Sequence, residues 1–308
     1  MEELAKLLIE ELSSLKTVKS KQLLKLVPQL NIFTETGTVS IGFKVGAGRL
    51  YIVKDVFQFL DIVSSGGTLP FGKNFIYDGS KYDFDEPSEM LLSLLIASYG
   101  NTFRIAGEKE LQLKTKIILP VFKLLAKIKT EIFINEKHYP GMKIRSSDIP
   151  VVSELSEKRG ILKIVYEDFL NISPILPDYS VCRYFGDLFI VSQNQSKLIA
   201  SFLNAYKTDG KVYANINPKL KQRVLTKVMP KLKAASNLIL DEAVKRDVII
   251  GQLQTKVYLD KTEDGDIKAT ALFCYGDAEF NHFAGEKPSI PSKVLLRDYN
   301  KENEFILA

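Results

Sequence analysis

One local pattern occurs four times in this 308-residue chain and limits the folds it can adopt. Each copy runs from a glycine through one or two polar residues, a short segment with an aromatic residue and a capping residue into a helical segment. This order predicts hairpins whose second strand leads into a helix. We therefore expect an α+β fold of antiparallel β-hairpins, each followed by a covering helix. The copies begin at Gly48, Gly79, Gly186 and Gly210.

Capping residues stand where these helices should begin. Such side chains accept hydrogen bonds from the first free N–H groups of a helix, and Pro87 and Pro218 lie near helix starts, where a missing N–H costs little. The copies are irregularly spaced, which indicates independent units and not a true repeat. The predicted N-caps are Asp55, Asp85, Ser192 and Asn217.

The chain suggests a division near Lys129, after a strand-rich opening. We expect domains at residues 1–129 and 130–308. No linker rich in Pro, Gly or Ser marks the boundary, so a single domain is the alternative. The opening segment MEELAKLLIEELSSL has leucines at helical spacing together with acids, and this predicts a helix of the fold, not a signal peptide.

The segment TKVYLDKTEDGDIKATALFCYGD predicts two strands about an Asp264–Gly265 turn. Its acids also imitate the start of a calcium-binding EF-hand loop. The twelfth position of that loop is Ala271, and not the bidentate glutamate that completes the calcium shell. The hairpin is therefore the better interpretation.

GGTLPFGKNF has the G-x-x-x-x-G-K spacing of a phosphate-binding P-loop in Gly67, Gly72 and Lys73. A P-loop needs a strand before the glycines and a helix after them. Here VKDVFQFLDIV predicts a helix before them, and NFIYDGSKYDF predicts a hairpin after them. Asn74 also lacks the hydroxyl that binds magnesium. We therefore expect neither ATPase activity nor tight ATP binding.

Composition narrows the class of protein. No apolar run is long enough to span a membrane. Cys182 and Cys274 lack the spacing of a zinc site or a disulfide framework, so we expect buried thiols in a reducing cytoplasm. His138 and His282 have no partner at a catalytic or metal-binding spacing. We expect no catalytic residues, no metal and no cofactor, although an independent enzyme with a site assembled from distant residues stays a minor alternative.

Positive charge is segregated along the sequence, beyond the formal net charge of +5. Three windows without any acid hold 16 of the 42 basic residues, which leaves 26 against 37 acids elsewhere. The longest such window lies between Asp209 and Asp241. Its candidate nucleic-acid-binding residues are Lys219, Lys221, Arg223, Lys227, Lys231 and Lys233.

Three stretches carry a family resemblance: GFKVGAGRLYIVKDVFQFLDIVSSGGTLPFGKNFIYDGSKYDFDE, VYLDKTEDGDIKATALFCYGD and VLLRDYNKENEFI. They resemble the helicase-associated region that precedes the motor in bacterial Swi/Snf-type helicases, from about residue 25 to the end. In that family FGKNF corresponds to a junction between a helix and a strand. The motor and the cysteine- and histidine-rich zinc module of the family are missing here, so we expect a fragment or a stand-alone relative.

The resemblance implies an accessory, non-catalytic role beside a Swi/Snf-type ATPase core, in cis or in trans. A helix predicted from Pro218 to about Met229 places Lys219, Arg223 and Lys227 on one face, beside a packing stripe of Leu220, Val224 and Val228. Such a basic face binds phosphates without sequence specificity, and double-stranded DNA is the expected partner. The alternative is a protein-interaction or autoinhibitory module that docks on the ATPase core without contacting DNA.

Overall fold

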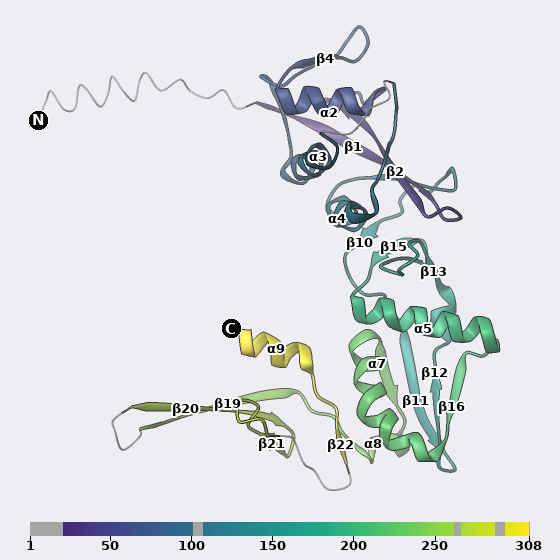
Figure 1. Ribbon diagram of the computed structural model, residues 1–308, viewed down its shortest axis with the longest axis vertical. Coiled ribbons are helices and arrows are strands. Elements are labelled where there is room, and N and C mark those ends of the chain that lie inside the picture. The colour runs from purple at the N-terminus through teal and green to yellow at the C-terminus, as the bar shows by residue number, and fades with distance from the viewer. Residues whose placement is uncertain (1–20, 101–106, 262–265, 287–292, 308) are drawn as a thin grey trace, which may run out of the picture. The chain divides into compact units, whose positions relative to one another are not determined.

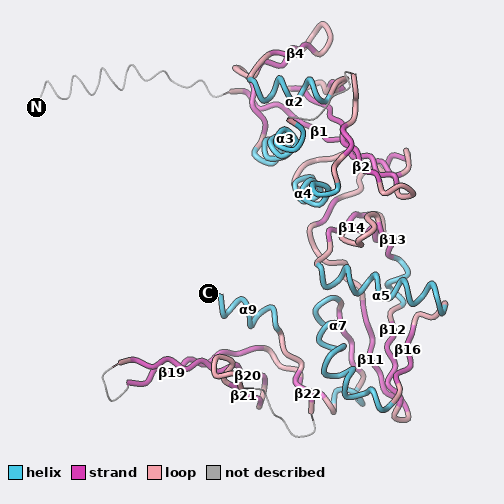
Figure 2. The backbone as a smooth tube through the Cα atoms, in the orientation of Figure 1, coloured by secondary structure: helices cyan, strands magenta, loops and turns pink. Residues whose placement is uncertain are grey.

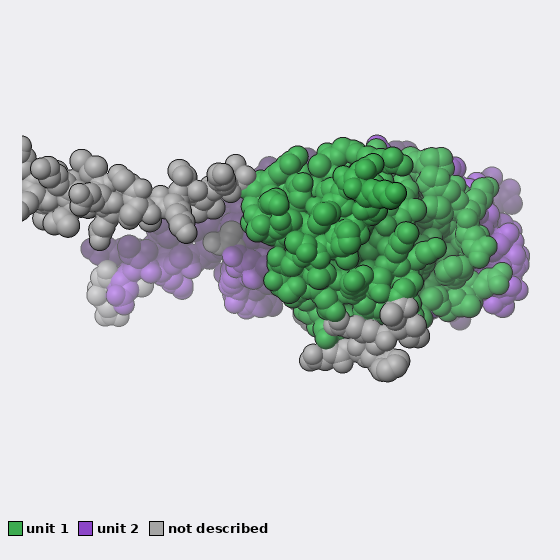
Figure 3. Space-filling view, turned by 90° about the horizontal axis from the view of Figure 1, so that it is seen from above, with its two compact units in different colours: residues 1–142 green, residues 143–308 purple. Residues whose placement is uncertain are grey.

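The computed structural model describes residues 21–100, 107–261, 266–286 and 293–307. The chain divides into two compact units, residues 1–142 (unit 1) and residues 143–308 (unit 2), which Figure 3 shows in green and purple. The helix predicted for the opening segment lies outside the described residues.

Unit 1 is built on a mixed sheet with the strand order β3-β2-β1-β8-β9. Its two long strands, β1 and β2, pair antiparallel, and β8 pairs parallel with β1. Two short strands extend the sheet, because β6 pairs parallel with the start of β1 and β7 pairs antiparallel with β2. The strands are β1 (Gln22–Phe33), β2 (Thr38–Gly46), β3 (Tyr51–Ile52), β6 (Tyr82–Phe84), β7 (Leu111–Gln112), β8 (Glu131–Ile134) and β9 (Lys137–His138).

Three helices and a small hairpin complete the described part of unit 1 (Figure 1). Phe59 of α2 is fully buried and lies 6.1 to 6.4 Å, between ring centroids, from aromatic rings of β2, β5, β6 and the loop after β4. This cluster joins the helix to the sheet. The elements are α2 (Val56–Ser65), α3 (Glu86–Tyr99), α4 (Thr115–Leu125), β4 (Thr68–Pro70) and β5 (Ile76–Asp78).

Unit 2 contains two four-stranded sheets, with the orders β10-β15-β14-β13 and β16-β12-β11-β17. The second is antiparallel except where β17 pairs parallel with β11. Helix α5 and the helical segment of residues 218–235, which ends in α7 (Met229–Ala235), pack beside this sheet (Figures 1 and 2). The elements are β10 (Ile144–Arg145), β11 (Val152–Lys158), β12 (Ile161–Val165), η1 (Glu167–Asn171), β13 (Ile172–Pro174), β14 (Val181–Tyr184), β15 (Asp187–Ile190), α5 (Gln193–Asp209), β16 (Tyr213–Ile216), β17 (Asn237–Leu240) and α8 (Glu242–Lys245).

The C-terminal part of unit 2 confirms the predicted hairpin, since β19 and β20 pair antiparallel over nine residues each. The Asp264–Gly265 turn itself lies outside the described residues. A small core of Phe273, Tyr275 and Phe280 anchors the base of the hairpin. The elements are β18 (Val248–Ile249), β19 (Leu253–Lys261), β20 (Ile267–Tyr275), β21 (Ala278–Phe280), β22 (Val294–Leu295) and α9 (Tyr299–Leu307).

The predicted α+β fold is confirmed, and so are the four N-caps, each of which accepts a backbone N–H at its helix start. The copies at Gly48 and Gly186 are hairpins that lead into a helix. The other two hairpins were predicted wrongly. After Gly79, β6 pairs with β1 and buries Phe84 against the large sheet, while β5 pairs with β4. After Gly210, β16 pairs with β12.

Candidate nucleic-acid interface

The longest basic window forms one continuous helical segment with four parts. Its parts are η2 (Pro218–Leu220), α6 (Lys221–Arg223), the π-helical turn η3 (Val224–Val228) and α7 (Met229–Ala235). The segment therefore extends past the predicted end near Met229. Pro230 gives the physical reason for the π turn, because it has no N–H for the carbonyl of Thr226 and its ring clashes there. The N–H of Met229 donates to the carbonyl of Val224, five residues earlier, which is the hydrogen-bond spacing of a π-helix.

One side of the segment packs into the core of unit 2. Leu225, Met229 and Leu232 are at most 1% exposed, and Val224 is also buried. The predicted packing stripe was wrong at Leu220, which is 47% exposed. Leu220 belongs to the 3₁₀ turn η2 at the start of the segment, before α6, and the stripe that packs begins at Val224.

Four cations lie along the exposed side at four-residue spacing, and we name them the basic row: Lys219, Arg223, Lys227 and Lys231. In an α-helix, residues four apart overshoot a full turn by about 40°. A π turn holds more residues, so the step from Arg223 to Lys227 falls short of a full turn and offsets this drift. None of the four has an acidic partner among the described residues.

Lys221 differs from the basic row because its ammonium group forms ion pairs with two carboxylates of unit 2. Its Nζ lies 2.7 Å from a carboxylate oxygen of Glu157 and 2.7 Å from one of Asp247. The hydrogen bonds to Asp247 and Glu157 raise the pKa of Lys221. Lys221 therefore fixes the start of the helical segment to the end of β11 and to the residues before β18. The sixth candidate, Lys233, is partly buried in a small pocket with Arg297 and Tyr299.

The P-loop-like stretch has the reversed order expected from the sequence. Helix α2 ends at Gly66, which adopts a left-handed conformation with φ of 68°. Strand β4 follows, and Phe71 donates its N–H to the carbonyl of Phe75 to close the loop before β5. FGKNF is thus the loop of a β4–β5 hairpin, and its assignment as a helix–strand junction was imprecise. A strand follows Lys73, where a P-loop needs a helix.

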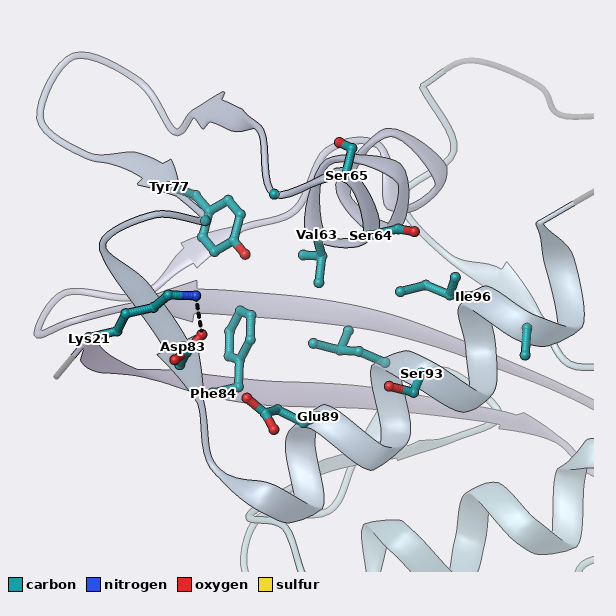
Figure 4. Close-up of a pocket in the computed structure, with 14 residues that line it drawn as sticks. Lys21, Val63, Ser64, Ser65, Tyr77, Asp83, Phe84, Glu89, Ser93 and Ile96 are labelled. Carbon is teal, nitrogen blue, oxygen red and sulfur yellow. Dashed lines mark hydrogen bonds and ion pairs between the residues drawn. The ribbon is translucent and has the colours of Figure 1, made fainter. Parts of the chain in front are cut away.

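A pocket of about 660 Å³ opens between α2, α3 and β6 (Figure 4). At its mouth Lys21 donates to Asp83 over 3.0 Å, and Tyr77 and Glu89 also line it. Burial, together with the charges of Asp83 and Asp78, raises the pKa of Tyr77. The hydroxyl of Tyr77 therefore stays protonated at neutral pH and can act as a hydrogen-bond donor.

The cysteines and histidines occupy structural positions. Cys182 and Cys274 are buried free thiols, and burial raises the pKa of Cys182 to about 12, which keeps it protonated and unreactive. His138 stacks on Phe133, and His282 stacks on Phe273. Across the described ranges, no three His, Cys, Asp or Glu side chains are grouped so that they could hold a metal ion.

None of the helices in the described part of the chain has the length and apolar character needed to cross a bilayer.

A family model described as bacterial SNF2 helicase associated matches residues 109–307. The match includes every element of unit 2 and, in unit 1, the elements from β7 onward. No curated protein and no solved structure matches the chain.

Proposed function

The chain belongs to the bacterial SNF2 helicase-associated family, and from this premise we propose that it is a non-catalytic accessory region of a bacterial SNF2-type DNA-dependent ATPase. It acts in the cytoplasm beside the ATPase core, in cis or in trans. Its contribution is a sequence-nonspecific contact to double-stranded DNA through the basic row, with Lys233 at the end of the same segment.

The basic row is the observation that carries this proposal. Four exposed cations recur at four-residue spacing along a helical segment whose other side packs in the core. Phosphates compete with no internal acid for these cations, since no described carboxylate pairs with them. Lysine and arginine contacts to phosphate give affinity by releasing counterions, and they carry no sequence information. In this proposal Lys221 positions the row and does not bind DNA.

A second candidate function is docking on the ATPase core without DNA contact, and the β19–β20 hairpin favours it. Val257 and Leu259 share one face of the hairpin with Ile267, because opposite residues of an antiparallel pair point to the same side. These side chains are 56%, 69% and 75% exposed. An exposed apolar face of this kind is typical of a protein-interaction surface. In this alternative, Leu259→Ser weakens association with the ATPase core.

The two candidates are separated by the salt dependence of DNA binding. The measurement is fluorescence anisotropy of a labelled duplex with the full chain over a salt series. Replacing Lys219, Arg223 and Lys227 together by Gln should leave folding within about 0.5 kcal/mol of the wild type. Each lost phosphate contact should reduce the slope of log affinity against log salt by about 0.9, or about 2.7 for three.

A matched control removes three exposed cations of the same unit from outside the row: Lys158, Lys197 and Lys207. This variant should keep the wild-type slope. If wild type fails to bind at low salt, or if both triple variants lose equal affinity, the basic row is not a DNA surface. Docking on the ATPase core then becomes the leading function.

A further inference from the structure

A second pocket, of about 630 Å³, lies in unit 1 where residues 49–55 and 69–74 meet. We name it the aromatic pocket. Tyr51, from the residues before α2, and Phe71, from the loop after β4, are the aromatic residues of its lining. It is separate from the pocket of Figure 4 and lies outside the residues that match the family.

The charges that line the aromatic pocket are unbalanced. Arg49, Lys54 and Lys73 are exposed at its edge, and none of them pairs with an acid within the described ranges. Asp55, the acid in the lining, already accepts two backbone hydrogen bonds. One of its oxygens accepts the N–H of Gln58, 2.9 Å away, and the other accepts the N–H of Gly107, 2.7 Å away. The pocket therefore favours an anionic ligand.

The two rings of the lining, Tyr51 and Phe71, belong to an aromatic cluster with Phe75, which lies just outside the lining. Tyr51 and Phe75 stack with centroids 5.4 Å apart and planes 14° apart, and Phe71 lies 5.6 Å from Phe75. The planar guanidinium of Arg49 already sits over the Tyr51 ring, 5.7 Å from its centroid. A base can take this position on the ring, and the exposed arginine is then available to a phosphate.

From these observations we propose that the aromatic pocket binds single-stranded nucleic acid. A base stacks on Tyr51, and the phosphates of the strand lie against Arg49, Lys54 and Lys73. Aromatic rings beside a row of cations are the two elements of sequence-tolerant strand binding. The site is independent of the basic row, which has cations but no aromatic platform. Lys73 thus has a role at the strand backbone, where the sequence pattern alone suggested only a defective P-loop.

The test is anisotropy of labelled dT15 with the full chain, beside an abasic strand of equal length. Wild type should bind dT15 at low salt and should bind the abasic strand at least about fivefold more weakly, because stacking supplies a large part of the affinity. The variant with Arg49, Lys54 and Lys73 changed to Gln should lose about 2 from the salt slope, at about 0.7 for each single-strand contact. Tyr51→Ser should weaken binding at least about fivefold.

Three controls keep the test decisive. Tyr51→Phe, which keeps the ring, should bind as wild type. Replacing Lys116, Lys123 and Lys127, exposed cations on and after α4, should leave dT15 binding unchanged. The basic-row variant should also bind dT15 normally, so failure of the duplex proposal leaves this one standing. Equal binding of the abasic strand, an unchanged salt slope for the pocket variant, or no binding of dT15 by wild type would overturn the proposal.

Discussion

The two units both present unpaired positive charge, but they arrange it differently. In unit 1 the cations of the aromatic pocket come from two chain segments that meet around stacked rings. In unit 2 the basic row comes from one helical segment and has no ring among its members. Cations repeated along one helical segment suit the regular phosphates of a duplex, whereas a pocket lined by aromatic rings suits an unstacked base.

The basic row and the aromatic pocket show two ways in which a sequence can encode a binding surface, through local spacing or through residues that only the fold brings together. The basic row depends on spacing within one segment, and it lies inside the residues that match the family. The aromatic pocket depends on a β3 segment and a β4–β5 loop that only the fold brings together. The two cores also differ in chemistry. The core of unit 1 centres on aromatic rings, and the core of unit 2 includes a buried, hydrogen-bonded glutamine. Changes to each core test whether the units are energetically separate.

The largest effect is expected at the centre of the aromatic core. Phe59→Ala should destabilise unit 1 by about 3–5 kcal/mol, because a fully buried ring is replaced by a cavity among aromatic neighbours. Hydrogen exchange followed by mass spectrometry should show lost protection in α2 and β2 and unchanged protection in α5 and β11. Ile52→Ala, at a 55% exposed position, is the control. Equal loss of protection in both units would contradict separate cores.

A smaller effect is expected from the polar contact in the core of unit 2. Gln195 is fully buried, accepts the N–H of Ile149 at 2.7 Å, and donates to the carbonyls of Ile149 and Ala235. Gln195→Leu should cost at least about 2 kcal/mol, since each buried group left unpaired costs roughly 1–3 kcal/mol. Urea unfolding measures the change, with the exposed Gln193→Ala as control. A stability equal to wild type would show that water or repacking satisfies these groups.

Sequence reasoning succeeded where the determinants are local. Asp55 and Ser192 cap their helices because a cap depends on residues within one turn. It failed for β6, which was predicted to form a local hairpin. This strand pairs with β1, about sixty residues earlier, and the pairing buries Phe84. Pro230 is present in the sequence and indicates a disturbed turn before it. The prediction of a regular helix from Pro218 did not include the π turn.

The candidate site shows the same limit. The spacing of the basic row is present in the sequence, but the separation of Lys221 from the row is not. That separation depends on Glu157 and Asp247, which come from distant parts of unit 2. Charge alone cannot distinguish a cation that binds DNA from one that is already paired.

Lys221 should therefore affect stability and not DNA binding. Lys221→Gln should cost about 1 kcal/mol, because its partners are partly exposed, while Lys227→Gln should cost less than about 0.5 kcal/mol. The pKa of Lys221 is raised in the folded state. Its stabilisation is thus fully present below the pKa of an unfolded lysine, about 10.4, and is lost as the pH rises through the higher folded value.

Urea midpoints for wild type and Lys221→Gln at pH 7, 9 and 10.5 check this dependence. The difference between the two proteins should be constant from pH 7 to 9 and should begin to shrink at pH 10.5. The variant should also keep the wild-type salt slope on duplex DNA. A reduced slope would place Lys221 on the DNA surface with the basic row and remove the distinction between them.

The smallest effect is expected for the binding and hydrolysis of ATP at the aromatic pocket. A P-loop wraps phosphates with the free N–H groups of a helix that follows its glycines. Here α2 precedes the glycines, and the carboxylate of Asp55 already occupies the N–H of Gln58 at its start. A mononucleotide therefore meets side-chain cations without a backbone cradle, whereas a strand adds further phosphates along the same edge. Calorimetric titration of the full chain should show no micromolar ATP affinity, and ATP hydrolysis should stay at background in both wild type and Lys73→Ala. Micromolar affinity that Lys73→Ala abolishes would make the loop a nucleotide site and would remove the contrast between a strand-binding pocket in unit 1 and a duplex-binding row in unit 2.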